Sequence, residues 1–163
     1  QRSLNWLPEL KLSNDEPLAA EARALEYSRS LTLFCLHESI LFYGQDLKNE
    51  QWIIEPLANM VISLSIMDTG FKRYIQIDKG QHKDETQDVL SLSIVDHFEN
   101  CHKNGLDIMN ELFTGEKFEE KVALVNEWRK KTEYAPKRIQ CQKRIFSSRK
   151  ILPEYIPTSG GHI

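Results

Sequence analysis

The chain has 163 residues, of which 40% are hydrophobic and 28% charged, and its formal net charge at pH 7 is −3. These values predict one globular domain with a single core. Because only 7 glycines and 6 prolines are present, without regularly spaced turn signals, a β-sandwich or barrel is disfavoured and we predict an all-α fold.

Residues 1–16 are expected to form an extended lead-in to the first helix. Asp15 and Glu16 are acids suited to a helix start, and Pro17 is tolerated in a first helical turn. Apolar residues then recur every three or four positions, which predicts a helix that extends to about Asp46, although Gly44 should fray its end. The predicted buried stripe is Leu18, Ala22, Leu25, Leu33, Leu36, Ile40 and Tyr43.

A second helix is predicted from about Glu50 to Tyr74. Its expected buried stripe is Ile53, Leu57, Met60, Val61, Leu64, Met67, Phe71 and Tyr74. Pro56 should bend this helix rather than end it, because a proline near a helix start removes little backbone hydrogen bonding. The apolar run "PLANMVISLSIM" is interrupted and falls short of the roughly 20 residues that a membrane span needs.

Asp84 and Gln87 have the spacing of a capping box for a third helix. Its expected stripe is Val89, Leu92, Val95, Phe98, Cys101 or His102, Gly105, Ile108, Met109 and Leu112, and Thr114 with Gly115 should stop it. A shorter helix is predicted through residues 118–128 and a last one through 138–150, followed by a proline- and glycine-bearing tail, 151–163. Three long helices with short connections predict an antiparallel up-down bundle that forms one domain over residues 1–163.

Glu99 and His102 have the Glu-x-x-His spacing of di-iron carboxylate bundles, in which both side chains point inward from one helix. Such a centre needs a second pair and two further glutamates, but no glutamate lies three residues before His37, His82 or His162. The ordinary interpretation is a core or solvated histidine. A metal-dependent bundle enzyme is therefore the weakest of three hypotheses.

Other candidate catalytic residues also lack partners in the sequence. His97 follows Asp96, but neighbours on a helix point in different directions, and no serine or cysteine is tied to them by spacing. Cys35, Cys101 and Cys141 lack the CxxC spacing of a zinc site. They are expected to act as small hydrophobic residues, and a reducing compartment fits them best. We therefore predict no catalytic, cofactor-binding or metal-binding residue in this chain.

Basic residues are concentrated near the end of the chain. Residues 129–150 contain nine lysines and arginines against one acid, Glu133, whereas the rest of the chain is net acidic. This predicts a docking surface for an acidic partner, an anionic membrane or a phosphate-bearing ligand, with a basic helix lying on the acidic bundle as the simpler interpretation. The net charge argues against nucleic-acid binding. The candidate residues are Arg129, Lys130, Lys131, Lys137, Arg138, Lys143, Arg144, Arg149 and Lys150.

Four stretches in order, "LPEL", "AAEARALEYS", "LKNEQWIIEPLANMVISLSIMDTGFKR" and "VDHFENCHKNGLDIMNELF", resemble the extra C-terminal helical domain of very-long-chain-type acyl-CoA dehydrogenases. The most specific element is Asn49-Glu50-Gln51, followed by Leu57-Ala58 and by Arg73 near the helix end. The resemblance implies part of an FAD-dependent enzyme that introduces the α,β double bond into a fatty acyl-CoA. In this family a catalytic glutamate abstracts the α-proton, and that glutamate and the flavin belong to a preceding core.

The resemblance also implies partners and a location. The expected partners are the dehydrogenase core itself, a second subunit in a homodimer, and either an anionic membrane surface or an electron-transferring flavoprotein. The expected location is the cytoplasm in a bacterium or the matrix side of the mitochondrial inner membrane in a eukaryote. Gln1 in place of an initiator methionine is consistent with a piece of a longer protein. The second hypothesis, from another class, is a free-standing interaction module that docks through residues 129–150.

Overall fold

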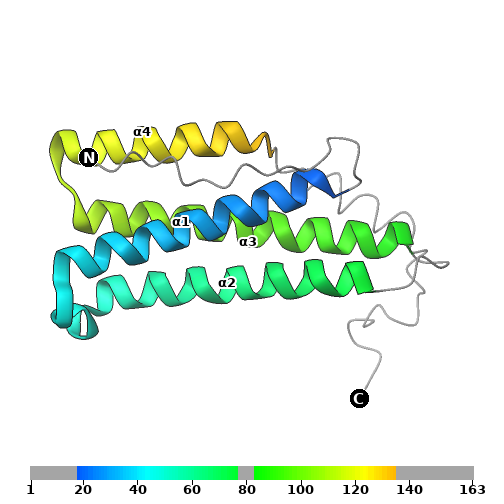
Figure 1. Ribbon diagram of the computed structural model, residues 1–163, viewed down its shortest axis with the longest axis horizontal. Helices are drawn as coiled ribbons and strands as arrows, with labels where there is room; N and C mark the ends of the chain where they lie inside the picture. Colours follow the sequence, from blue (N-terminus) through cyan, green and yellow to red (C-terminus); the bar gives the residue numbers. More distant parts are fainter. Residues whose placement is uncertain (1–17, 77–82, 135–163) are drawn as a thin grey trace, which may run out of the picture.

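The computed structural model describes residues 18–76 and 83–134, which form helices without a strand. They are α1 (Ala19–Tyr43), the 3-10 turn η1 (Gly44–Asn49), α2 (Gln51–Gln76), α3 (Lys83–Leu112) and α4 (Gly115–Thr132). Successive helices run antiparallel (Figure 1). The predicted all-α bundle is confirmed, whereas the predicted lead-in, last helix and tail lie outside the described residues.

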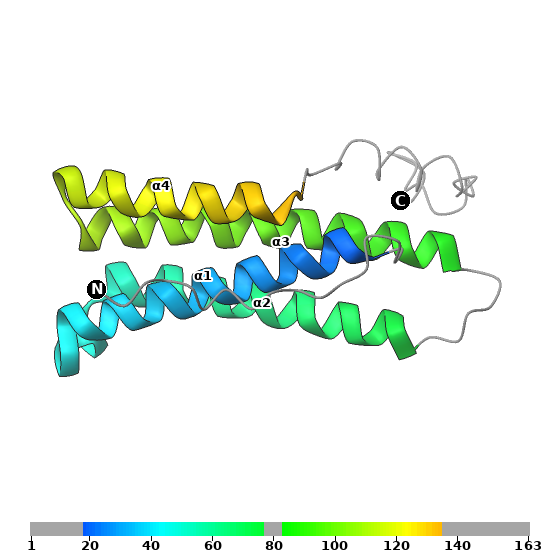
Figure 2. The same cartoon turned by 45° about the horizontal axis from the view of Figure 1, so that its top comes forward.

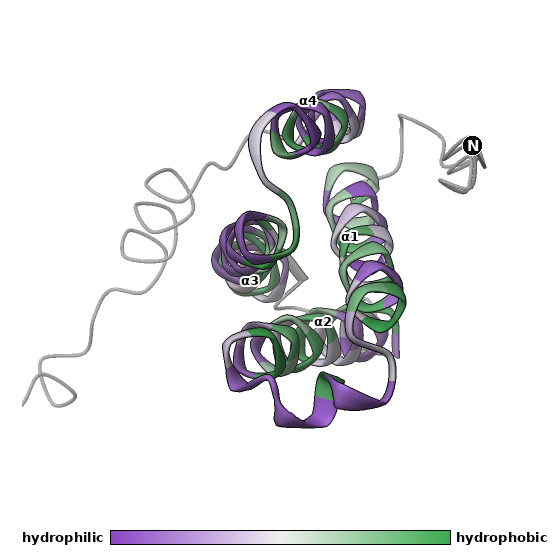
Figure 3. Ribbon diagram, turned by 90° about the vertical axis from the view of Figure 1, so that its left-hand side faces the viewer, coloured by the Kyte–Doolittle hydropathy of each residue, from purple (hydrophilic) through white to green (hydrophobic). Residues whose placement is uncertain are grey.

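The four helices form a layered bundle. Seen from one end, α2 and α4 lie on opposite sides, with α1 and α3 between them (Figure 3). α1 is inclined to the other three helices (Figure 2). Near its start it reaches α4, because the Arg23 side chain donates a hydrogen bond from Nε to the carbonyl oxygen of Thr132 at 2.8 Å. α4 lies on the far side of the bundle from α2 and does not cover its outer surface (Figure 3).

The C-terminal ends of α1 and α3 follow the residues that predicted them. α1 stops at Tyr43, and Gly44 has a φ of 55°, a left-handed backbone that glycine adopts at low cost. α3 stops at Leu112, and Gly115, with a φ of 57°, turns the chain into α4. Pro56 lies inside α2, close to its start, and the helix continues through it. α3 begins at Lys83, so Asp84 lies inside the helix and its predicted place as the capping residue is wrong.

The core is formed by apolar side chains from all four helices. Phe34 of α1 packs edge-on against Trp128 of α4, with 5.7 Å between ring centroids, and Tyr27 packs on Phe98 at 5.1 Å. α1 and α3 approach so closely at Gly105 that a Cβ atom there would lie 2.8 Å from Leu31. Other fully buried side chains are Ile53, Met60, Met67, Ile94, Ile108, Met109 and Val125.

The predicted buried face of α1 is wrong over the second half of the helix. Leu33, Leu36 and Ile40 are exposed, and the core-facing residues there are Leu31, Phe34 and Cys35, together with Ala24 and Tyr27 one or two turns earlier. Two further predicted core residues, Val61 in α2 and Val89 in α3, are also exposed. Three large apolar residues of α1 therefore lie at the surface of the bundle and not in its interior.

Candidate docking surfaces

Only three residues of the predicted basic surface, Arg129, Lys130 and Lys131, lie in the described part of the chain. Arg129 donates a hydrogen bond to Glu99 at 2.5 Å and lies 5.1 Å from the centroid of the Phe98 ring. Lys131 forms an exposed ion pair with Glu127 on the same helix. All three lie in the last turn of α4, where positive charge stabilises a helix end. Lys137, Arg138, Lys143, Arg144, Arg149 and Lys150 lie outside the described residues.

Glu99 and His102, the predicted Glu-x-x-His pair, contact different partners. Glu99 accepts from Arg129 of α4, whereas His102 Nδ1 lies 2.6 Å from the buried hydroxyl of Tyr27 on α1. Burial, followed by the Arg129 charge, lowers the pKa of His102, and burial raises the pKa of Tyr27. The neutral imidazole therefore accepts the tyrosine hydrogen at Nδ1. Over residues 18–76 and 83–134, no three His, Cys, Asp or Glu side chains group as metal ligands do.

The structure joins His97 to a serine that sequence spacing did not reveal. Ser63 of α2 is buried, and its Oγ lies 3.1 Å from Nδ1 of His97. The same oxygen accepts a hydrogen bond from the Asn100 side chain at 2.7 Å. A buried hydroxyl that is bonded to both neighbours has no approach for a substrate, so these residues are best understood as polar contacts that fix α2 against α3.

The two described cysteines are core residues. Cys35 and Cys101 are fully buried and free. Burial raises the pKa of the Cys35 thiol to about 12 and that of Cys101 to about 11, so both remain protonated near neutral pH. Because the thiolate is the nucleophile, these thiols are unreactive, as expected of small hydrophobes. Cys141 lies outside the described residues.

Large apolar side chains gather on the outer surface of α1 and α2. The six residues that form this surface are each between 39% and 57% exposed, whereas core residues are under 9% exposed. α2 has no charged residue over the twelve positions 56–67, and α1 has no acid, lysine or arginine between Arg29 and Glu38. We call this surface the α1–α2 apolar face; its residues are Leu33, Leu36 and Ile40 of α1 and Val61, Ile62 and Ile66 of α2.

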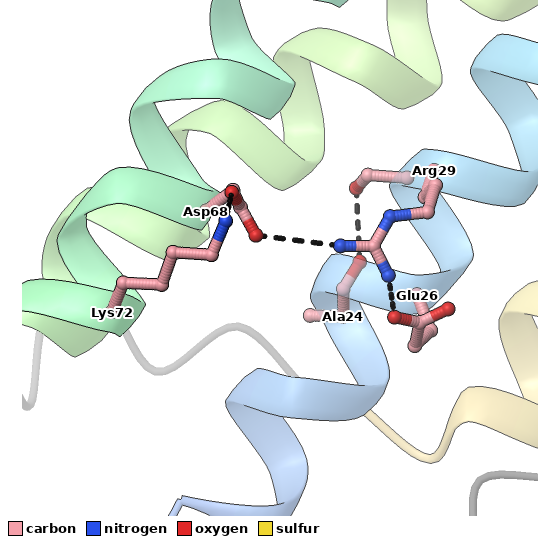
Figure 4. Close-up of polar contacts among 6 residues, drawn as sticks. Ala24, Glu26, Arg29, Asp68 and Lys72 are labelled. Carbon is pink, nitrogen blue, oxygen red and sulfur yellow. Dashed lines mark hydrogen bonds and ion pairs between the residues drawn. The ribbon is translucent and has the colours of Figure 1, made fainter. Parts of the chain in front are cut away.

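An ion pair between the two helices places these residues at the same level of the bundle. Arg29 of α1 lies 3.4 Å from Asp68 of α2, and Figure 4 shows its guanidinium between Asp68 and Glu26, with which it also pairs. Since α1 and α2 are antiparallel, Leu36, seven residues after Arg29, lies opposite Val61, seven residues before Asp68. Leu36 and Val61 therefore lie side by side beyond one charged boundary, and Ile62 and Ile66 continue the apolar surface round the outer side of α2 toward α3.

The charged boundary itself is well ordered by its contacts. Asp68 also accepts from Lys72 at 2.6 Å, so one carboxylate holds a cation from each helix (Figure 4). On a monomer, a contiguous apolar surface of this kind marks an interaction site for protein or membrane. No helix among residues 18–76 and 83–134 is both long and apolar enough to cross a bilayer.

No family model and no curated protein matches the sequence. A solved structure does match the fold: a crystal structure of an acyl-CoA dehydrogenase complexed with FAD from Bacillus anthracis, with a TM-score of 0.75 and 17% sequence identity. The match covers 85% of this chain but 24% of the dehydrogenase chain. The described helices therefore share the fold of a helical part of that enzyme, and this chain spans about a quarter of its length.

Proposed function

We propose that this chain is the C-terminal helical domain of an FAD-dependent acyl-CoA dehydrogenase of the very-long-chain type. On this proposal it contributes no catalytic residue. It packs on the dehydrogenase core, supports the dimer, and offers a docking surface to a membrane or an electron-transferring flavoprotein. Its location would then be that of the parent enzyme, either the bacterial cytoplasm or the matrix side of the mitochondrial inner membrane.

The observation that carries the proposal is the α1–α2 apolar face. Apolar surface gains about 25 cal/mol per Å² when it is buried, so leaving it in water is unfavourable. A bundle that acted alone is therefore expected to carry polar residues at these positions. A domain that belongs to a larger enzyme exposes such a face when its neighbour is absent. The fold match supports this interpretation, because the dehydrogenase from Bacillus anthracis has three quarters of its chain outside the matching part.

The chemistry of the described residues agrees with a supporting role. The buried Ser63 hydroxyl contacts His97 and also accepts a hydrogen bond from Asn100, so it is held in place between two side chains of α3. Glu99 is paired with Arg129, and both buried thiols are protonated. The catalytic glutamate and the FAD site of the proposed parent would therefore belong to its core, and no glutamate of this chain is assigned as the base.

The test starts from the coding sequence upstream of Gln1, which should encode a flavin-binding dehydrogenase core. The core and this chain are produced separately, and their association is measured by calorimetry. We expect binding to weaken at least about tenfold in the Ile62→Gln/Ile66→Gln variant, because each substitution replaces buried apolar surface at the interface with an amide.

The matched control is Ile75→Gln/Val89→Gln, which makes the same chemical change at two exposed residues outside the α1–α2 apolar face. This variant should bind the core as the parent does. An upstream sequence that encodes no dehydrogenase core would sink the proposal, and equal weakening in both variants would remove the assigned role of the face.

A further inference from the structure

A second surface, between α2 and α3, is charged rather than apolar. It is a groove of about 270 Å³, and the residues that matter for its chemistry are Trp52, Glu55 and Asn59 of α2 and Asn104, Asp107 and Glu111 of α3. This volume is below the range of cofactor and drug-sized sites, so the groove suits protein side chains better than a whole small molecule. It lies on the α3 side of α2, where its residues Glu55 and Asn59 precede Ile62 and Ile66 of the α1–α2 apolar face by seven positions each.

The polar groups of the groove are mostly hydrogen-bond acceptors. Glu55, Asp107 and Glu111 are exposed, and no lysine or arginine among residues 18–76 and 83–134 forms an ion pair with any of them. Asp107 and Glu111 are four residues apart and so share one face of α3. Three carboxylates around one groove repel one another, and a cation bound between them would relieve this repulsion.

Asn104 adds a buried acceptor to the same groove. This residue is only 8% exposed, and its Nδ2 donates to the backbone carbonyl of Asn100 at 2.7 Å and to the Asn100 side chain at 3.1 Å. Since a carbonyl oxygen only accepts, these contacts fix which end of the amide is nitrogen. The Asn104 oxygen is left with one contact, from Asn59 at 3.5 Å, which is too long for a strong hydrogen bond. A donor that enters the groove would satisfy it.

Trp52 supplies an aromatic surface at the edge of the groove. Its side chain is 78% exposed, more than any other large hydrophobic residue among those described. An indole face attracts cations, and a guanidinium both stacks on it and donates to carboxylates in its own plane. Tryptophan is also among the residues that dominate the binding energy of protein interfaces.

We propose that the α2–α3 groove binds an arginine-bearing basic segment of a partner protein. One guanidinium lies against Trp52 and donates to Glu55 and Glu111, and a second cation along the segment donates to Asp107 and to the Asn104 oxygen. A protein segment fits better than a small free cation, because the lining residues of α3 from Asn104 to Glu111 extend over about 10 Å and present separate charges. This inference does not depend on the proposed dehydrogenase origin.

The test uses the whole chain and the synthetic peptide Gly-Arg-Arg-Gly-Arg-Arg-Gly, blocked at both ends, with the dissociation constant measured by calorimetry at low salt. A peptide in which citrulline replaces every arginine keeps the shape and removes the charge. We expect the arginine peptide to bind, the citrulline peptide not to bind, and the indole N–H signal of Trp52 in the NMR spectrum, assigned with Trp52→Phe, to shift during the titration.

Two variants locate the site. Asp107→Asn/Glu111→Gln should weaken peptide binding about tenfold, and Trp52→Leu should weaken it severalfold. The matched control is Glu119→Gln/Glu120→Gln, which removes the same charge from two exposed acids of α4. Circular dichroism checks that each variant remains helical.

Three results would overturn the proposal. One is no binding of the arginine peptide to the parent protein, and another is equal weakening in the groove variant and the α4 control, which would indicate non-specific attraction. The third is binding of arginine amide as tight as that of the peptide, which would make the groove a site for small cations. None of these results bears on docking of a dehydrogenase core, which is tested on the α1–α2 apolar face.

Discussion

The contact between Tyr27 and His102 makes the stability of the bundle depend on pH. Burial, with a further effect from the Arg129 guanidinium, lowers the pKa of His102 below its usual value of 6.5, while Glu99 acts in the opposite direction. The unfolded chain therefore binds more protons than the folded chain in the pH range just below 6.5. The contribution of His102 to stability is complete above that value and is lost as the pH falls through the lowered pKa of the folded state.

We expect the parent protein to lose more thermal stability between about pH 7.5 and about pH 5 than a His102→Gln variant does. Glutamine keeps a hydrogen-bonding group near Tyr27 but does not titrate. The control is His37→Gln, because His37 is exposed and its side chain is 65% accessible. This variant should follow the parent. If His102→Gln and the parent show the same pH dependence of the melting temperature, His102 is not the group responsible.

Sequence spacing predicted how site residues lie relative to one another only when they are close together along the chain. The Glu99-x-x-His102 spacing correctly placed two side chains on one helix, but the partners that define their roles, Arg129 and Tyr27, are 30 and 75 residues away. Ser63 and His97 are likewise brought together only by the packing of α2 on α3. Spacing along a helix carries no information about such pairs, because they depend on the register between helices.

At the scale of the elements, the closest helix packing depends on one glycine. A Cβ atom on Gly105 would lie 2.8 Å from Leu31 Cδ2 and 3.0 Å from its Cγ, so α1 and α3 must separate or Leu31 must leave its rotamer. Overpacking of this kind costs about 1–3 kcal/mol, whereas replacing a helical glycine with alanine gains about 1 kcal/mol. The steric cost is therefore expected to be the larger effect.

We expect Gly105→Ala to lower the free energy of unfolding by about 1 kcal/mol, as measured by urea denaturation. Gly70→Ala in α2 is the matched comparison. Its Cβ would lie 3.2 Å from one atom only, Leu90 Cδ1 at the end of a flexible side chain, so this variant should be the more stable of the two. The opposite order would mean that α1 and α3 separate at little cost.

Helix positions were predicted better than helix orientation. Gly44, Thr114 and Gly115 marked the ends correctly, because the local backbone decides where a helix stops. α1, however, has apolar residues on nearly every side, so both the true core residues, such as Leu31 and Cys35, and the exposed Leu36 fit a spacing of three or four. For such a helix the periodicity does not show which side is buried, and the packing against α3 and α4 decides it.

The whole molecule combines a complete internal core with an external apolar surface. Tyr27, Phe34, Phe98 and Trp128 join α1, α3 and α4, while Ile53, Met60 and Met67 bury the inner side of α2. The α1–α2 apolar face adds nothing to this core, since its side chains are about half exposed. Figure 3 shows that α4 lies on the far side from α2 and so leaves the face uncovered. The fold of the bundle and the use of its surface can therefore be separated experimentally.

Two isoleucines make this separation measurable. Ile62 of the α1–α2 apolar face is 57% exposed, whereas Ile94 of α3 is fully buried. Ile62→Gln should change the free energy of unfolding by no more than about 0.5 kcal/mol, because surface substitutions rarely do more. Ile94→Gln should lower it by about 3 kcal/mol or more, because it removes packed methyl groups and buries an amide without a partner.

Urea denaturation of the two variants beside the parent measures both effects, with the slope of the transition checked for constancy. A large loss in Ile62→Gln would show that the face is part of the structural core of this chain, and its role as a docking surface would then be wrong. If Ile62→Gln keeps full stability but loses binding to the dehydrogenase core, folding does not require the apolar surface. Its exposure would then be explained by the partner that covers it.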